Sequence, residues 1–282
     1  MRWQGREKST NVEDRRGGTI RRIGGGIGIG AIILAIIAFL MGENPLNVLQ
    51  KYSNENTQYT TQQTNQNTDE LTEFISVALK ETEDVWTKLF REQLNRQYVP
   101  PTLVLYSNAT ESACGFAQSA TGPFYCPADQ KVYIDLSFYD ELKTRFKAPG
   151  DFAMAYILAH EVGHHVQYLL GISSEVESMR RRMNEAQGNR LSVGLELQAD
   201  FLAGVWAHHT QKMKNILEEG DLEEAMRAAS SVGDDRIQME ARGYVVPDAF
   251  THGTSAQRME WFKKGFISGD LSQGDTFDKI NY

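Results

Sequence analysis

The distribution of apolar and polar residues divides the chain into distinct parts. Residues 23–42, IGGGIGIGAIILAIIAFLMG, carry no charge, whereas residues 54–69, NENTQYTTQQTNQNTD, are almost entirely Asn, Gln and Thr. An apolar stretch of about 20 residues, rising about 1.5 Å per residue, matches a hydrocarbon core of about 30 Å. Residues 54–69 are too polar to form a hydrophobic core. The pattern predicts a transmembrane helix over residues 23–42, a flexible polar linker over 43–70 and a globular domain over 71–282.

Within the globular domain, the apolar residues alternate between helical and strand-like spacing. Helical spacing is found from Leu71 onward, as one long helix or two short ones, and over residues 152–170, 190–215 and 222–231. Asp151 stands in position to cap the helix over 152–170. Two strands are predicted, over residues 100–106 and, by alternation, over 131–139. The tail from Asp235 is expected to mix short helices with loops. A helix-rich domain with a small sheet belongs to the α+β class.

Charge is distributed unevenly along the chain. With 29 Lys and Arg against 37 Asp and Glu, the net charge is -8, which argues against a nucleic-acid partner because phosphate binding needs a basic face. Residues 1–22 are the exception, with Arg2, Arg6, Lys8, Arg15, Arg16, Arg21 and Arg22 against Glu7, Glu13 and Asp14.

Basic residues stay on the cytoplasmic side of a membrane. We therefore expect residues 1–22 to form a cytoplasmic segment and the C-terminal domain to lie in the periplasm or outside the cell, anchored in the bacterial inner membrane by a single span. A cleaved signal peptide is the alternative. The long basic region and the lack of a clear cleavage site after Leu40 favour an uncleaved anchor.

The chain has two cysteines, Cys114 and Cys126, in the stretch CGFAQSATGPFYC. In an oxidising compartment an isolated pair of this kind is expected to form a disulfide that closes a short loop. On the chain-entropy model such a bond stabilises the fold by about 3 kcal/mol. Two free buried thiols in a cytosolic domain are the alternative reading.

The stretch AHEVGHHVQ, residues 159–167, contains the pattern His-Glu-x-x-His. Residues four apart on a helix share one face, so His160 and His164 can bind the same metal ion. Glu161 lies beside them and can act as a general base on a water molecule, the arrangement of zinc peptidases. His165 lies about 100° further round the helix and should not join the site.

A catalytic zinc needs a third protein ligand and an open fourth position. Glu196 and Asp200 are four apart in LSVGLELQADFLAGVWAHH, where the other residues are mostly apolar. We predict that Glu196 is the third ligand and that Asp200 accepts the second ring N–H of a ligand histidine. The small residues Ala199 and Ala203 are expected to let another helix come close, and Gly163 is expected to do the same on its own helix.

His-Glu-x-x-His followed some thirty residues later by Glu-x-x-Ala-Asp resembles the gluzincin branch of zinc peptidases. Together with ELQADFLAG, GDDRIQ and THGTSAQRMEWFKKG, the sequence resembles the bacterial putative neutral zinc metallopeptidase family, which is membrane-anchored, over nearly the whole chain. The resemblance implies a zincin-like fold and a Zn²⁺ cofactor. In that fold the strand before the metal helix often pairs with the substrate backbone. Residues 131–139 are in place for this role, and an ordinary sheet strand is the equal alternative.

The sequence therefore predicts a membrane-anchored zinc endopeptidase that acts on proteins or peptides outside the cytoplasm. A donor to the developing oxyanion is also needed. His252 in THGTSAQR is the first candidate for this second catalytic residue, with Tyr244 and Arg258 behind it. The GDD at residues 233–235 could bind a second cation, but a helix-ending turn is favoured.

A different class of function is also compatible with the ligand pattern. The chain could be a zinc-stabilised binding or chaperone-like module with little proteolytic activity. Glu161 favours the enzyme, because a purely structural zinc site has no use for a base.

Overall fold

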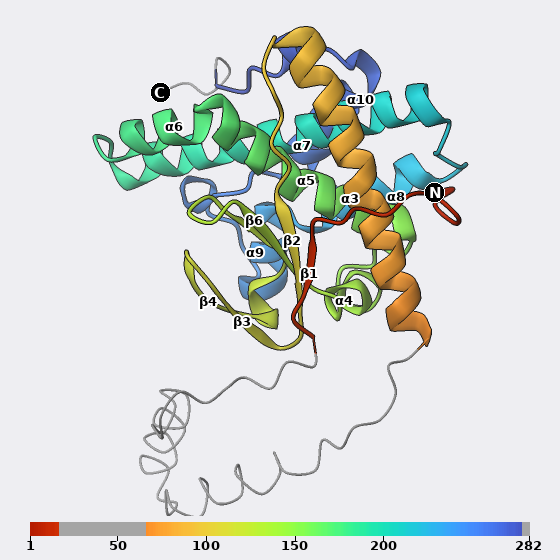
Figure 1. Ribbon diagram of the computed structural model, residues 1–282. Helices are drawn as coiled ribbons and strands as arrows, with labels where there is room; N and C mark the ends of the chain where they lie inside the picture. The colour runs from red at the N-terminus through yellow and green to blue at the C-terminus, as the bar shows by residue number, and fades with distance from the viewer. Residues whose placement is uncertain (17–65, 278–282) are drawn as a thin grey trace, which may run out of the picture. The chain divides into compact units, whose positions relative to one another are not determined.

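Long helices surround a small sheet in the computed structural model, which describes residues 1–16 and 66–277 (Figure 1). The helices are α3 (Gln66–Gln93), α4 (Phe138–Thr144), α5 (Asp151–Leu170), α6 (Ile172–Arg180), α7 (Glu185–Lys214), α8 (Asp221–Ser231), α9 (Asp234–Arg242) and α10 (Ser255–Ser268). The strands are β1 (Val12–Asp14), β2 (Thr102–Tyr106), β3 (Ala109–Ser112), β4 (Gly115–Gln118), β5 (Phe124–Cys126) and β6 (Lys131–Asp135). This arrangement is a helix-rich α+β fold, as the sequence predicts.

The main sheet has the strand order β1-β2-β6-β5. Strands β1, β2 and β6 are parallel, and β5 runs antiparallel to β6, while β3 and β4 form a separate hairpin. The predicted strand over residues 131–139 is shorter than expected. It ends at Asp135, whose carboxylate accepts hydrogen bonds from the backbone N–H of Asn108 (2.8 Å) and Ser137 (2.9 Å), and α4 begins at Phe138.

Residues 1–16 belong to the same compact unit as the chain from Glu70 onward. Strand β1 runs beside β2 (Figure 1). Met1 is buried in the core. The expectation of a separate basic segment over residues 1–22 is therefore corrected for its first sixteen residues. The reason is a backbone pairing with β2, about ninety residues away in sequence, which the local charge pattern does not encode.

The predicted span over residues 23–42 lies outside the described residues, as does the predicted linker up to residue 65. Helix α3 already begins at Gln66, inside the predicted linker, and continues as one helix rather than two. Among the helices that the structure describes, none is long and apolar enough to cross a membrane.

Two helix starts differ from the sequence expectation. Helix α5 begins at Asp151, but Gly150 occupies the N-cap position, and the backbone N–H of Phe152 donates to Oε2 of Glu224 on α8 (3.1 Å). Helix α7 begins at Glu185, more than a turn before the predicted start. Asn184 and Gln187 form a capping box there, in which each side chain accepts a hydrogen bond from the backbone N–H of the other residue.

Glycines allow the helices that carry the site to pack closely against one another. A Cβ atom on Gly163 of α5 would lie 3.0 Å from the carbonyl oxygen of Ala199 on α7, which confirms the predicted small-residue contact. The crossing of α7 and α10 is closer still. A Cβ on Gly204 would lie 2.1 Å from the carbonyl oxygen of Phe262, and one on Gly265 would lie 2.0 Å from that of Phe201. These crossings fix the spacing of α5, α7 and α10.

The predicted disulfide between Cys114 and Cys126 is confirmed. It joins the turn between β3 and β4 to the last residue of β5. The bond therefore braces the loop that leads into the edge strand of the main sheet.

Replacing Gly204 by Ala should lower the free energy of unfolding by about 1–3 kcal/mol or more, because the new methyl group must force α7 and α10 apart. The matched control is Gly188→Ala in the same helix, where the nearest atom would be 3.8 Å away. That change should be neutral or should stabilise by up to about 1 kcal/mol. Urea unfolding of both variants checks the prediction, and equal midpoints would contradict it.

Candidate metal centre

Two helices bring the three predicted ligands together. His160 and His164 lie one turn apart on α5, and Glu196 faces them from α7. The Nε2 atom of His160 is 3.1 Å from Oε2 of Glu196, and Nε2 of His164 is 3.4 Å from Oε1. The three candidate ligand atoms lie within 4.8 Å of one another. Two imidazole nitrogens and a carboxylate oxygen form a donor set that suits zinc.

The second ring nitrogen of each histidine has an oxygen partner. Nδ1 of His160 is 2.9 Å from Oδ1 of Asp200, and Nδ1 of His164 is 2.9 Å from Oε1 of Gln167. With Nδ1 donating to these oxygens, Nε2 of each ring is left to bind a metal. The amide of Gln167 is held in turn, because its Nε2 donates to the carbonyl of Leu195 (2.7 Å).

Gln167 was not among the residues predicted from the sequence. The spacing in the sequence could have identified it, because Gln167 follows His164 by three positions on the same helix and so lies on nearly the same face. The same holds for Tyr156, which precedes His160 by four positions and donates its hydroxyl hydrogen to Asp200.

Asp200 is fully buried, and the structure places it where the sequence suggested, behind His160. Arg258 of α10 makes a bidentate ion pair with it: Nε donates to Oδ2 (2.8 Å) and Nη2 donates to Oδ1 (3.0 Å). Burial disfavours the Asp200 carboxylate, but Arg258 and His160 outweigh burial and lower the pKa of Asp200.

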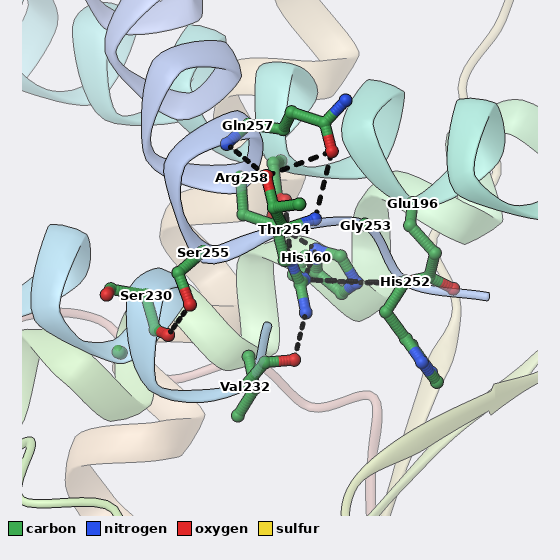
Figure 2. A network of polar contacts seen from close by, with 12 residues as sticks. His160, Glu196, Ser230, Val232, His252, Gly253, Thr254, Ser255, Gln257 and Arg258 are labelled. Carbon is green, nitrogen blue, oxygen red and sulfur yellow. Dashed lines mark hydrogen bonds and ion pairs between the residues drawn. The ribbon is translucent and has the colours of Figure 1, made fainter. Parts of the chain in front are cut away.

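Arg258 was the third candidate for the oxyanion donor, and its main contact is instead with Asp200. Figure 2 shows its guanidinium group beside the ring of His160, and Nη2 lies 3.3 Å from Nδ1 of His160. Tyr244, the second candidate, is 59% exposed and is not among the residues that line the cleft.

The electrostatics of the site follow from burial and from the facing charges. Burial opposes a charge on His160, but Asp200 and Glu196 outweigh this and raise the pKa of His160 to about 9. Burial likewise disfavours the Glu196 carboxylate, yet the two histidines hold its pKa well below the usual range. Burial raises the pKa of Glu161, and the charge of Glu196 adds to that effect.

The candidate ligands open onto a cleft of about 470 Å³, which His252 lines from the loop before α10. Asp234 holds this loop: its Oδ2 accepts from the backbone N–H of Thr251 (2.7 Å), His252 (2.6 Å) and Gly253 (3.1 Å). Its Oδ1 lies 3.2 Å from Nδ1 of His252, a hydrogen bond that raises the pKa of His252.

The GDD stretch at residues 233–235 both ends one helix and begins the next, because the N–H of Gly233 donates to the carbonyl of Ser230 at the end of α8 (3.5 Å). Gly233 occupies the N-cap position of α9, and Asp234 is the first residue of that helix. The carboxylate of Asp234 is used to fix the His252 loop. The sequence showed both motifs but not that they meet, because some seventeen residues separate them.

The strand beside the cleft is β5 and not β6. Phe124 and Tyr125 of β5 line the cleft, whereas β6 is paired with β2 on one side and β5 on the other. A strand with both edges paired cannot add a substrate strand. For residues 131–139, the alternative of an ordinary sheet strand is therefore correct.

His165 does not join the metal ligands, as predicted. It is fully buried, with Nε2 donating to the carbonyl of Val99 (2.7 Å) and Nδ1 accepting from the hydroxyl of Tyr125 (2.9 Å). This histidine therefore ties α5 to β5 and to the segment that precedes β2.

The fold and the site together define an α+β protein with a candidate His-His-Glu metal centre in an open cleft. A sequence model of the family described as "Putative neutral zinc metallopeptidase" matches residues 1–277, and the chain belongs to this family. The family description names both zinc and peptide hydrolysis, in agreement with the donor set.

The chain also has bacterial relatives, which are described as uncharacterized proteins. The chain is 49% identical to the uncharacterized protein YpfJ of Escherichia coli (strain K12) over 287 residues, which cover 99% of each chain. It is 42% identical over 191 residues to the uncharacterized protein Rv2575 of Mycobacterium tuberculosis, covering 64% of this chain and 63% of the relative. No solved structure matches the chain.

Replacing Asp200 by Asn should weaken zinc binding by about 10- to 100-fold, because His160 loses the charged acceptor that orients its ring. Competition with a zinc-binding dye measures the affinity. Asp248→Asn is the control, since Asp248 lies in an exposed segment and its side chain is 74% exposed. Equal zinc affinity in the two folded variants would remove Asp200 from the support of the site.

Proposed function

We propose that the protein is a zinc-dependent endopeptidase with a zincin-like fold, which hydrolyses peptide bonds in proteins or peptides. The observation that carries this proposal is the convergence of His160, His164 and Glu196, with Glu161 beside them, at an open cleft. Such a site offers three ligands and leaves access for a substrate, as catalytic zinc sites do. The family membership of the chain supports the same reaction class.

We also propose that the protein is anchored to the bacterial inner membrane and acts outside the cytoplasm. The disulfide between Cys114 and Cys126 supports an oxidising compartment, because such bonds rarely persist in the cytosol. Extracytoplasmic proteins or peptides would then be the substrates.

A bound zinc ion supplies Lewis acidity, which makes water a better nucleophile near neutral pH and a peptide carbonyl a better electrophile. His160, His164 and Glu196 would hold the ion. Glu161 would take a proton from the attacking water and return it to the leaving amine. Its raised pKa makes its carboxylate a stronger base than an exposed one.

His252 is the proposed donor to the negative charge that develops on the carbonyl oxygen. Its Nδ1 lies against Asp234, so Nε2 is left for the cleft. When Nδ1 donates to Asp234, Nε2 carries a hydrogen only in the protonated ring. The proposed role therefore needs the charged form of His252, which Asp234 favours.

Replacing Glu161 by Gln should lower the cleavage rate by about 10²- to 10⁴-fold while zinc content stays equal, because the general base is lost and the ligands are kept. Cleavage of a mixed peptide library by the full zinc-loaded chain measures this. Glu177→Gln is the control, since the side chain of Glu177 is 50% exposed on α6. Zinc binding without cleavage by the unsubstituted chain would favour the binding-module alternative.

Replacing Asp234 by Asn should move the alkaline limb of the pH–rate profile to lower pH. Asp234 raises the pKa of His252, so the protonated donor persists to higher pH in the unsubstituted chain and is lost as pH rises through that pKa. Without the carboxylate, His252 loses its proton at lower pH, and activity falls from that lower pH onward. Asp248→Asn serves again as the control, and an unchanged alkaline limb in Asp234→Asn would exclude His252 as the titrating donor.

A further inference from the structure

We infer that residues 1–16 lie in the same compartment as the catalytic cleft. The inference rests on how these residues pack against the domain, and it stands whether or not the chain hydrolyses peptides. It changes the membrane topology that the charge pattern suggests.

The first support is backbone pairing. The carbonyl of Asn11 accepts a hydrogen bond from the backbone N–H of Leu103 (2.8 Å), and the N–H of Arg15 donates to the carbonyl of Leu105 (2.8 Å). Between them, Val12–Asp14 pair in parallel with residues 103–105. Residues 1–16 thus supply one edge strand of the main sheet.

The second support is apolar packing. The side chain of Met1 is only 5% exposed within the main core. Trp3 packs edge-to-face on Phe74 of α3, with ring centroids 5.6 Å apart. Burial of such side chains stabilises the domain, so the segment is part of the core and not a tail resting on it.

The third support is polar and concerns buried carboxylates on α3. Glu83 is 9% exposed, and its Oε1 accepts from the hydroxyl of Ser9 (2.6 Å) and from Nδ2 of Asn11 (2.8 Å). Glu81 is 2% exposed, and Nη1 of Arg6 lies 3.7 Å from it. Removing the segment would take both donors from the buried Glu83, which is costly, whereas Glu81 would keep Lys214, whose Nζ lies 2.7 Å from its Oε2.

The basic residues of the segment also have acidic partners in the described part of the chain. Lys8 pairs with Glu73 of α3 (3.1 Å), and Arg16 pairs with Asp14 of β1 (2.6 Å). Their charge is used within the fold, which weakens its value as a signal for cytoplasmic retention.

Paired strands lie about 4.8 Å apart, whereas a hydrocarbon core is about 30 Å thick. Residues 12–14 and residues 103–105 therefore cannot be on opposite sides of a bilayer. Residues 1–16 and the domain then lie on the same side of any membrane to which the chain is anchored. If the domain lies outside the cytoplasm, residues 1–16 lie there with it.

Two single-cysteine variants of the full chain test the inference in bacterial cells. Lys8→Cys reports on the segment, where the side chain of Lys8 is 53% exposed, and Arg181→Cys reports on α6, where the side chain of Arg181 is 77% exposed. A membrane-impermeant maleimide is applied to cells with a permeabilised outer envelope and, separately, to lysed cells. The unsubstituted chain, whose Cys114 and Cys126 are paired, gives the background.

We expect the two positions to behave alike. Labelling of both before lysis supports a shared compartment outside the cytoplasm. Protection of both until lysis also supports a shared compartment, but overturns the proposed extracytoplasmic location. Labelling of one position and protection of the other before lysis overturns the inference.

Amide hydrogen exchange on the purified full chain gives a second, independent measurement. Because the N–H of Leu103 donates to Asn11, its exchange should be at least about 100-fold slower than in an unstructured peptide. Exchange of Leu103 at the rate of an open strand edge would show that β1 is not paired in the protein, and would overturn the inference.

Discussion

The candidate site depends on one buried ion pair, between Asp200 and Arg258. An unpaired carboxylate with no exposed surface would cost several kcal/mol, so Asp200 requires its partners. Those partners come from two other helices, His160 and Tyr156 from α5 and Arg258 from α10. One carboxylate thereby fixes the orientation of a ligand ring and the relative placement of three helices.

The glycine contacts make that arrangement possible. Arg258 reaches Asp200 because α7 and α10 cross at backbone distance through Gly204 and Gly265. Gly163 performs the same role between α5 and α7, next to the ligands themselves. Packing and electrostatics are therefore coupled: the helices must approach closely for the ion pair to form, and the ion pair compensates the charge that this approach buries.

The N-terminal segment extends the same principle to another part of the domain. Acidic side chains on α3 are buried, and residues 1–16 provide partners for them as well as an edge strand. A stretch whose composition resembles a charged tail is thus a structural part of the domain. Because the segment is part of the sheet, we infer that it and the cleft lie in the same compartment.

Local patterns in the sequence determined much of the fold and the core of the site. Helical spacing located α3, α5, α7 and α8, and the i, i+4 pairs His160–His164 and Glu196–Asp200 marked the ligand faces, because one helical turn places such residues together. The disulfide was also predictable from the sequence, because Cys114 and Cys126 are only twelve residues apart.

Tertiary structure decided the rest. The pairing of β1 with β2, the Asp234–His252 contact and the ion pair of Arg258 with Asp200 join residues that are distant in sequence. Spacing along a chain shows which residues share a helix face or a strand face. It does not show which faces meet, because that depends on how all the helices and strands bury their apolar surface together.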